Sequence, residues 1–251
     1  MSEQLDSAAY YHIAYQQHRI MNPLSDERFL LLAEQCELGP ESRVLDIGSG
    51  NGWSSLLLAK EWDCSSVQVD ISEYWTDQAR SLFGAHGFSA RTAIHCMDAK
   101  NFAHEEAAYD LVVCLGTAPV YGGFAEALQV FSSCLKPDGR VIIGEPSARL
   151  PLPKRYAEYL KMLQWEVHGE RQLMRIIDDG GFEMLWNLRS TQDEWDRYMS
   201  LQWQSVSDHA RAFADEEQSQ DFLEWVRDEQ EVYLRYQRHW VEWNVMLLRA
   251  I

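Results

Sequence analysis

Short apolar runs alternate with longer segments of helical periodicity along most of the chain. Apolar runs of roughly four to eight residues, and runs in which apolar and polar positions alternate, predict strands. We expect seven strands, at 44–47, 66–70, 92–97, 109–115, 141–146, 183–188 and 243–249. Helices are expected between the early strands, at 53–62 and 75–85. This alternation predicts an α/β fold with a Rossmann-like, seven-stranded, mostly parallel sheet and helices on both faces.

Two helices are predicted before the first strand. The first covers 7–19 and is rich in tyrosine, and it ends before Pro23 because the residue preceding a proline avoids helical backbone. Ser25 is a good N-cap for the second helix, which a glycine-proline pair ends. Tyr15 and His18 either close over a ligand bound beyond the first strand or only pack their helix on the core. The sequence leaves both interpretations open.

A long helical insertion is predicted between the sixth and seventh strands, over about 193–239. Apolar residues recur there at helical spacing, which predicts a buried face: Phe222, Val226, Tyr233 and Trp240. The segment 191–239 holds twelve acids and five arginines, as is typical of a solvated face. Three aromatic residues of the insertion either wall a substrate pocket or belong to the core: Trp195, Tyr198 and Trp203.

The length of 251 residues allows one large domain or two small ones, with ample core in either case. We expect a single domain over 1–251, because one sheet accounts for all the predicted strands. Its parts, in chain order, are an N-terminal helical cap, a core that contains six strands, the helical insertion and the last strand: 1–42, 43–190, 191–239 and 240–251.

Composition indicates which kinds of binding partner and which cellular compartment are expected. The net charge of -17 argues against nucleic acid, because neutralising phosphates requires a basic surface. No apolar run approaches the ~20 residues of a membrane span, and residues 1–11 lack the pattern of a secretory signal. Five cysteines without metal-type spacing are typical of reduced core thiols. We expect a cytoplasmic protein without a nucleic-acid or membrane partner, and no oligomeric state is predicted.

A glycine turn follows the first strand and precedes a helix. Glycines at 48, 50 and 52 let the backbone turn sharply and approach a ligand closely. The dinucleotide fingerprint G-x-G-x-x-G needs a third glycine at the position of Trp53, so the spacing is G-x-G-x-G instead. Asp46 lies two residues before this turn. The pattern argues against a nicotinamide dinucleotide.

Two further acids end the next two predicted strands. Asp70 lies 24 residues after Asp46, close to the ~20-residue spacing that puts an acid on ribose hydroxyls. A carboxylate suits that position because it can accept hydrogen bonds from both hydroxyls. Asp98 occupies the corresponding place after the following strand. An acid at a strand end also commonly caps the following helix, and this alternative remains open for Asp70.

The glycine turn, the two acids and the strands at 109–115 and 141–146 together resemble the class I S-adenosylmethionine (SAM)-dependent methyltransferases. The resemblance implies SAM as cofactor, with the turn under its amino-acid and ribose parts. It also implies that Asp98 meets the adenine amino group and that Ile71 touches the adenine face. The full expected cofactor set is Arg19, Asp46, Gly48, Ser49, Gly50, Asn51, Gly52, Asp70, Ile71, Asp98, Ala99, Leu115 and Gly116.

Shorter segments are similar to a bacterial subgroup of uncharacterised small-molecule methyltransferases: 18–20, 144–146 and 194–198. The base-amino signature Asn/Asp-Pro-Pro-aromatic is missing after the strand at 109–115, where Gly-Thr-Ala-Pro stands instead. The acids that hold a divalent ion in catechol-type enzymes are missing there too. The expected function is therefore metal-independent methyl transfer to the oxygen, nitrogen or sulfur of a small molecule.

Two residues are candidates for a general base. His18 titrates near neutrality, and Glu145 ends a predicted strand. Arg19 matches the carboxylate of SAM or of the acceptor, although a His-Arg pair before a turn can also simply cap a helix. Two other functions stay open: an aminopropyl transferase, for which no polyamine-binding acids are evident, and a non-catalytic SAM-binding or regulatory protein.

Overall fold

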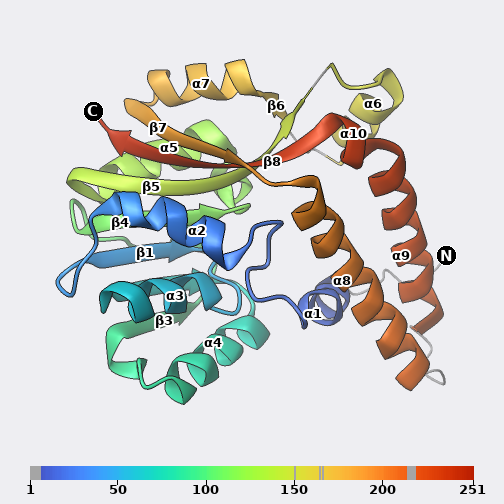
Figure 1. The fold of residues 1–251 in the computed structure, drawn as a ribbon, viewed down its shortest axis with the longest axis horizontal. Coiled ribbons are helices and arrows are strands. Elements are labelled where there is room, and N and C mark those ends of the chain that lie inside the picture. The colour runs from blue at the N-terminus through green and yellow to red at the C-terminus, as the bar shows by residue number, and fades with distance from the viewer. Residues whose placement is uncertain (1–6, 150, 164, 166, 214–218) are drawn as a thin grey trace.

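The computed structural model describes residues 7–149, 151–163, 165, 167–213 and 219–251 (Figure 1). Its strands are β1 Arg43–Ile47, β2 Ser65–Asp70, β3 Thr92–Cys96, β4 Tyr109–Leu115, β5 Leu135–Ala148, β6 His168–Gly169, β7 Phe182–Arg189 and β8 Val241–Ala250. Its helices are α1 Ser7–Tyr15, α2 Asp26–Ala33, α3 Trp53–Trp62, α4 Glu73–Ala85, α5 Phe124–Cys134, α6 Lys154–Met162, α7 Glu170–Asp179, α8 Gln192–Ala212, α9 Ser219–Val232 and α10 Arg238–Trp240. The expected Rossmann-like α/β class is confirmed.

The sheet has the order β3-β2-β1-β4-β5-β8-β7, with β6 paired to β5 off this path. All pairs are parallel except β5–β8 and β7–β8, so the sheet is mostly parallel as predicted. The expectation of seven strands was one short. The missing strand, β6, has two residues and pairs only with the end of β5, so it leaves no periodic signal in the sequence.

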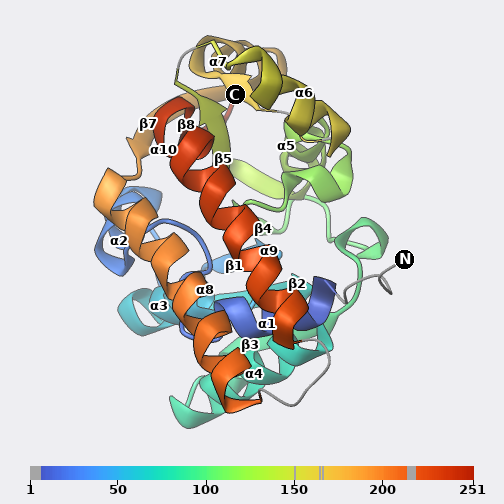
Figure 2. The same ribbon diagram turned by 90° about the vertical axis from the view of Figure 1, so that its right-hand side faces the viewer.

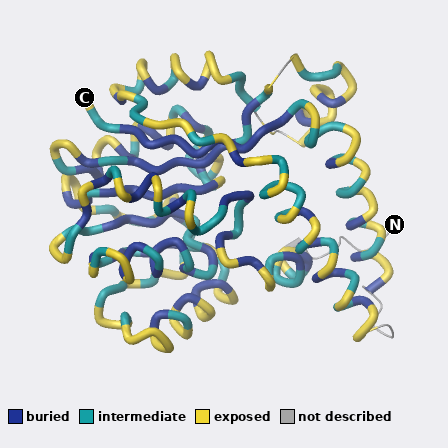
Figure 3. Tube along the Cα trace, in the orientation of Figure 1, coloured by how far each residue is buried: buried dark blue, intermediate teal, exposed yellow. Residues whose placement is uncertain are grey.

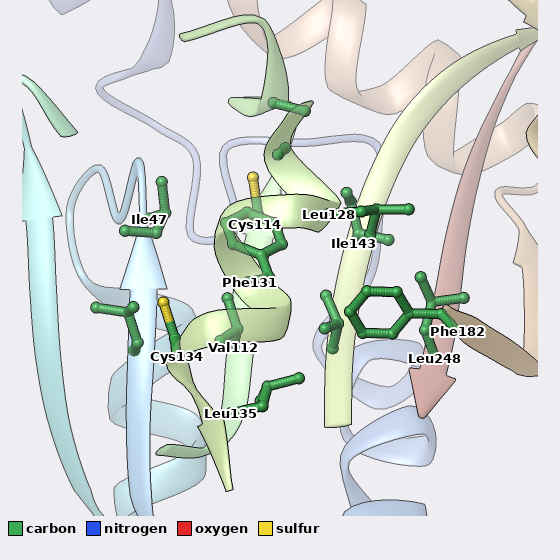
Figure 4. Packing of buried hydrophobic residues seen from close by; sticks show 14 of the residues in the cluster. Ile47, Val112, Cys114, Leu128, Phe131, Cys134, Leu135, Ile143, Phe182 and Leu248 are labelled. Atoms are coloured by element: carbon green, nitrogen blue, oxygen red, sulfur yellow. The ribbon is translucent and has the colours of Figure 1, made fainter. Parts of the chain in front are cut away.

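The core has two layers, one on each face of the sheet. Alternate residues of β4 point to opposite faces. Val112 and Cys114 pack with Phe131 of α5 (Figure 4) and with α7. Leu111 and Val113 pack with α2 and α3 on the other face. Burial on both faces explains why β4 reads as a continuous apolar run rather than an alternating one.

Helix starts follow capping chemistry. The Ser25 side chain accepts a hydrogen bond from the backbone N–H of Arg28, which confirms Ser25 as the N-cap of α2. Helix α4 begins at Glu73, two residues before the predicted start, because Ser72 caps it by accepting from the N–H of Trp75. Thr191 caps α8 through a capping box with Glu194, a start signal that the prediction did not use.

The predicted first helix was too long, since α1 ends at Tyr15 rather than at Arg19. The side-chain amide of Asn51 donates to the backbone carbonyls of His18 (2.9 Å) and Arg19 (3.0 Å). These carbonyls are therefore satisfied by the glycine turn and not by continued helix. The chain after α1 instead runs over that turn.

Helices α8 and α9 form the expected insertion and stand with α1 beside the carboxyl edge of the parallel strands (Figures 1 and 2). Tyr10 of α1 is buried and stacks on Trp225 of α9, with ring centroids 4.1 Å apart. The outward faces of these helices are exposed (Figure 3). Within the described ranges, no helix has both the length and the apolarity to cross a membrane.

Candidate functional site

The glycine turn between β1 and α3 is tightly packed. Gly48 has a φ of 68°, and a Cβ there would lie 2.7 Å from Cβ of Thr117 and closer still to its Oγ1. Gly52 has a φ of 77° and is the N-cap of α3, and a Cβ there would lie 2.7 Å from Oε1 of Gln68. Both positions therefore combine left-handed backbone with the absence of room for a side chain. The spacing of these glycines follows from that geometry.

Asp70 ties the end of β2 to the glycine turn. Its Oδ2 accepts from the N–H of Gly50 and its Oδ1 from the N–H of Ser72, both at 2.9 Å. Burial raises the pKa of its carboxyl, and the two hydrogen bonds oppose that shift. Ser72, not Asp70, is the cap of α4. Each carboxylate oxygen has a second lone pair that remains available for a ligand.

Asp46 lies at the end of β1 and is buried. Its Oδ2 accepts a hydrogen bond from Oγ of Ser55 at 2.7 Å. Burial, together with the neighbouring charge of Asp70, raises the pKa of Asp46 to about 7, although the hydrogen bond from Ser55 opposes the shift. The two acids therefore form the polar base of the turn.

Arg19 lies over the turn, at the start of the chain segment that Asn51 holds. Its guanidinium is 4.9 Å from the ring centroid of Trp53 and 3.5 Å from Oδ2 of Asp26. The side chain is largely exposed and lines the main cavity. It is therefore placed to meet an anionic group at the mouth of the cavity.

His18 faces away from the cavity. Its side chain is 7% exposed, and its Nε2 donates to the backbone carbonyl of Tyr198 at 3.0 Å. Burial lowers the pKa of His18. His18 lines a separate surface hollow with Arg197 instead of the main cavity. In this arrangement His18 fastens the N-terminal segment to α8 and does not line the main cavity.

The main cavity has a volume of about 560 Å³, within the usual range for small-molecule sites. One end, which we call the turn end, is lined by 48–51, Asp70 and Gly116. The other, which we call the helical end, is lined by side chains from α1, α6, α8 and α9: Tyr15, Tyr156, Trp195, Tyr198, Gln202 and Glu229. One continuous space thus joins the two groups of elements.

The structure brings most of the predicted site residues to this cavity. Ten of them line it: Arg19, Asp46, Gly48, Ser49, Gly50, Asn51, Asp70, Leu115, Gly116 and Glu145. Five do not: His18, Gly52, Ile71, Asp98 and Ala99. Ile71 is 73% exposed, and Oδ1 of Asp98 accepts from the N–H of Lys100. The ligand roles of all these residues stay predictions.

Glu145 lies on the floor of the cavity, where β5 passes the end of β4. The N–H of Gly116 donates to the carbonyl of Gly144 at 2.9 Å, which fixes Glu145 beside the loop after β4. Glu145 is 8% exposed, and its Oε1 has no hydrogen-bond partner among the described residues. Burial raises the pKa of its carboxyl to about 8. An acid in this state takes up and releases a proton near neutral pH.

Tyr15 and Tyr198 both line the cavity, and their hydroxyls are 2.8 Å apart. Trp195 also lines it. Trp203, the third aromatic residue considered in the insertion, instead packs against Tyr233 with ring centroids 5.8 Å apart. Of the three, Trp195 and Tyr198 are thus wall residues, whereas Trp203 belongs to the helical core.

Several wall residues were not selected from the sequence: Tyr156, Gln202, Glu229, Gln237 and Trp243. They come from segments far apart in the chain, so no spacing connects them. One indirect signal was available at Gly144, since glycine inside a strand often marks a close approach. A Cβ on Gly144 would lie 2.7 Å from the ring of Trp243.

A family model described as a methyltransferase domain matches residues 44–139. The chain is 29% identical over 252 residues to the uncharacterised protein YjhP of Escherichia coli (strain K12), covering 98% of this chain and 100% of YjhP.

Two solved structures are similar over almost the whole chain. A SAM-dependent methyltransferase from Geobacter sulfurreducens, in complex with S-adenosyl-L-homocysteine, has a TM-score of 0.89 at 25% identity, covering 99% of this chain and 100% of that one. A SAM-dependent methyltransferase from Thiobacillus denitrificans, in the same kind of complex, has a TM-score of 0.86 at 26% identity and covers 96% and 98%.

Proposed function

We propose that this chain, which is similar to SAM-dependent methyltransferases, transfers the methyl group of SAM to a small-molecule acceptor without a metal ion. The observation that carries this proposal is the cavity that joins the turn end to a helical end lined by side chains. A space of about 560 Å³ suits a small acceptor beside the cofactor. The net charge of -17 is a further argument against a polyanionic acceptor.

The residues of the turn end fit SAM. The hydroxyl of Ser49 is buried in the cavity wall and has no partner among the described residues, so it offers a hydrogen bond to a ligand. Asp70 would accept from the ribose hydroxyls, and Arg19 would bind the amino-acid carboxylate. Leu115 and Gly116 would line the space between these groups. Asp98, Ala99 and Ile71 would lie beyond the cavity, toward the adenine.

Bound SAM supplies a methyl group on a positively charged sulfur, and the acceptor attacks the methyl carbon in line with the C–S bond, so that the sulfur leaves. The contribution of the chain is then to align the acceptor and to exclude water. Tyr15 and Tyr198 would close the space by joining α1 to α8. Glu145 is the preferred base, because it lines the cavity and its raised pKa of about 8 suits proton transfer near neutrality.

Metal independence is supported by the donor chemistry of the site. The loop after β4 begins Gly116-Thr117-Ala118-Pro119 and offers no carboxylate. In the part of the chain that the structure describes, no three His, Cys, Asp or Glu side chains lie close enough to hold an ion. Methyl displacement from sulfur also needs no Lewis acid when the acceptor is aligned.

The test is isotope transfer from methyl-labelled SAM to small-molecule products, with and without EDTA. We expect labelled products in both conditions. A rate that falls with EDTA and returns with magnesium would contradict metal independence. SAM binding without any transfer would instead favour a non-catalytic binding protein.

We also propose that the chain is a single domain, because its N-terminal cap, core, insertion and last strand all contribute residues to one cavity. A single cooperative unfolding transition is expected in calorimetry. Two separate transitions would indicate two domains.

A further inference from the structure

We propose that the methyl acceptor is an amine, bound as a cation between Glu145 and the aromatic walls of the cavity. The inference rests on the methyl transfer proposed above and names the chemical class of the acceptor. Its basis is the unequal distribution of charge within the cavity.

The cavity is lined by four acids: Asp46, Asp70, Glu145 and Glu229. Among the described lining residues, Arg19 is the only lysine or arginine. Arg19 pairs with Asp26 and stacks on Trp53, so its charge lies over the turn end. The rest of the cavity therefore carries carboxyl groups without a lysine or arginine beside them.

These carboxyl groups differ in how they are satisfied. Asp46 and Asp70 at the turn end accept hydrogen bonds from Ser55 and from backbone N–H groups. Glu229 accepts from Nε1 of Trp225 at 3.3 Å. Glu145 is more than nine-tenths buried, and its Oε1 has no partner among the described residues. A ligand that donates a hydrogen bond to Glu145 would offset the free-energy cost of burying a carboxyl group without a partner.

Charge decides which donor fits best. An ammonium group satisfies a carboxylate with a charge-assisted hydrogen bond, which is stronger than a neutral one. An acceptor with a phosphate or carboxylate near Glu145 would place like charges together, with no lysine or arginine to offset them. Trp195 and Trp243 line the cavity, and their indole N–H groups have no hydrogen-bond partner among the described residues, but these donors are uncharged and suit a neutral oxygen.

Tyrosine and tryptophan residues from four elements, α1, α6, α8 and β8, also line the cavity: Tyr11, Tyr15, Tyr156, Trp195, Tyr198 and Trp243. The faces of tyrosine and tryptophan rings attract cations, most strongly where water is excluded. The same rings pack against the hydrocarbon part of an acceptor. A wall of this composition with buried carboxyls suits an organic amine better than a neutral alcohol or an acid.

The proton balance of the reaction gives Glu145 a defined role. Binding of the ammonium R–NH₃⁺ stabilises the ionised form of Glu145, so the proton that the free carboxyl holds leaves to solvent on binding. The bound R–NH₃⁺ then gives one proton to the Glu145 carboxylate and becomes R–NH₂. Its lone pair forms the N–C bond to the methyl carbon while the C–S bond breaks, and sulfur keeps the bonding pair and becomes neutral. The product is R–NH₂⁺–CH₃, and Glu145 then returns its proton to solvent. Burial raises the pKa of the Glu145 carboxyl, which brings it closer to the pKa of the ammonium and so makes the proton transfer less unfavourable.

The first experiment uses methyl-labelled SAM and a deproteinised bacterial metabolite extract. Labelled products are separated from SAM by chromatography and assigned by mass spectrometry. Label on the nitrogen of a cationic product is the expected result. Label in an ester, ether or thioether overturns the amine assignment but leaves methyl transfer standing. No label in any product overturns methyl transfer, and the acceptor class with it.

The second experiment uses variants and the same labelled assay. Glu145→Gln should lower transfer at least ~100-fold while S-adenosylhomocysteine affinity, measured by calorimetry, stays within twofold. Glu145→Asp, which keeps the carboxylate, should restore part of the rate. Glu158→Gln is the matched control, because Glu158 is an exposed acid of α6 that does not line the cavity. Equal transfer by the Glu145→Gln variant and the control would contradict the assignment.

Discussion

The turn end and the helical end of the cavity are built in different ways. The turn end comes from 48–51, Asp70 and Gly116, which lie at or directly after the ends of β1, β2 and β4, so the place of each residue depends on nearby backbone. The helical end brings together residues such as Tyr15 and Tyr198, which are 183 positions apart. The first is fixed by local geometry and the second by the packing of helices. We therefore expect cofactor binding to be sensitive to single backbone changes and acceptor recognition to depend on side chains.

The largest effect is expected for Gly48→Ala. The new Cβ would overlap Thr117 in left-handed backbone, so the turn must move. SAM affinity should fall at least ~1,000-fold, equivalent to ~4 kcal/mol, when measured by calorimetry. Gly87→Ala is the control, because Gly87 has a φ of 78° but nothing within 4 Å of its Cβ position. Similar losses of affinity in both variants would show that the clash with Thr117 is not the cause.

The second prediction concerns pH and the floor of the cavity. Burial raises the pKa of Glu145 from 4.5 to about 8, so between these values the folded chain keeps a proton that the unfolded chain loses. The unfolding free energy should therefore fall as pH rises through this window, by at most ~1.4 kcal/mol per pH unit. Asp46, with a pKa of about 7, contributes in the same direction. Glu145→Gln should remove the contribution of Glu145 to this dependence of the unfolding free energy on pH.

The measurement is the melting temperature of the wild type and of Glu145→Gln from pH 5 to pH 9. The variant should gain stability relative to the wild type as pH rises. Parallel curves would mean that Glu145 is ionised in the folded protein at neutral pH.

A smaller effect is expected for Asp70→Asn. Asparagine keeps the shape but loses the charge and part of the acceptor capacity, so SAM binding should weaken at least ~10-fold, or ~1.4 kcal/mol. Ser72→Ala removes the cap of α4 and should lower stability by ~1 kcal/mol without weakening SAM binding. If Asp70→Asn leaves SAM affinity unchanged, Asp70 serves only the turn.

The smallest effect is expected from the tyrosine pair at the helical end. In a double-mutant cycle, Tyr15→Phe and Tyr198→Phe should show a coupling of ~1 kcal/mol in unfolding free energy, because their hydroxyls share one hydrogen bond. SAM affinity should stay within twofold in all three variants. A tenfold loss of SAM affinity would show that the two ends of the cavity are not independent.

The same contrast explains what could be predicted from the sequence. The glycine turn and Asp70 could be predicted because a strand end and left-handed backbone each favour particular residues at neighbouring positions in the sequence. Asp98 was expected in the site from its place after a strand and from the family resemblance; it caps the turn that follows β3 and does not line the cavity, so its role toward the adenine stays a prediction. Glu229 and Gln202 left no signature, since helices far apart in the chain bring them together. His18 was marked by its chemistry, but packing against Tyr198 sets the direction of its ring.

Strand β8 follows β7 in the chain but lies between β5 and β7 in the sheet. During synthesis the edge of β5 therefore lacks its neighbour until the ribosome has also added the α8–α9 insertion. At the usual rate of translation, the ~50 residues of that insertion take roughly 3–10 s. During this time β5 has an unpaired edge in the nascent chain. That edge contains Val141, Ile142 and Ile143, which are buried and paired with β8 in the folded protein. Chaperone protection of this emerging edge would lower the risk that it pairs with another chain.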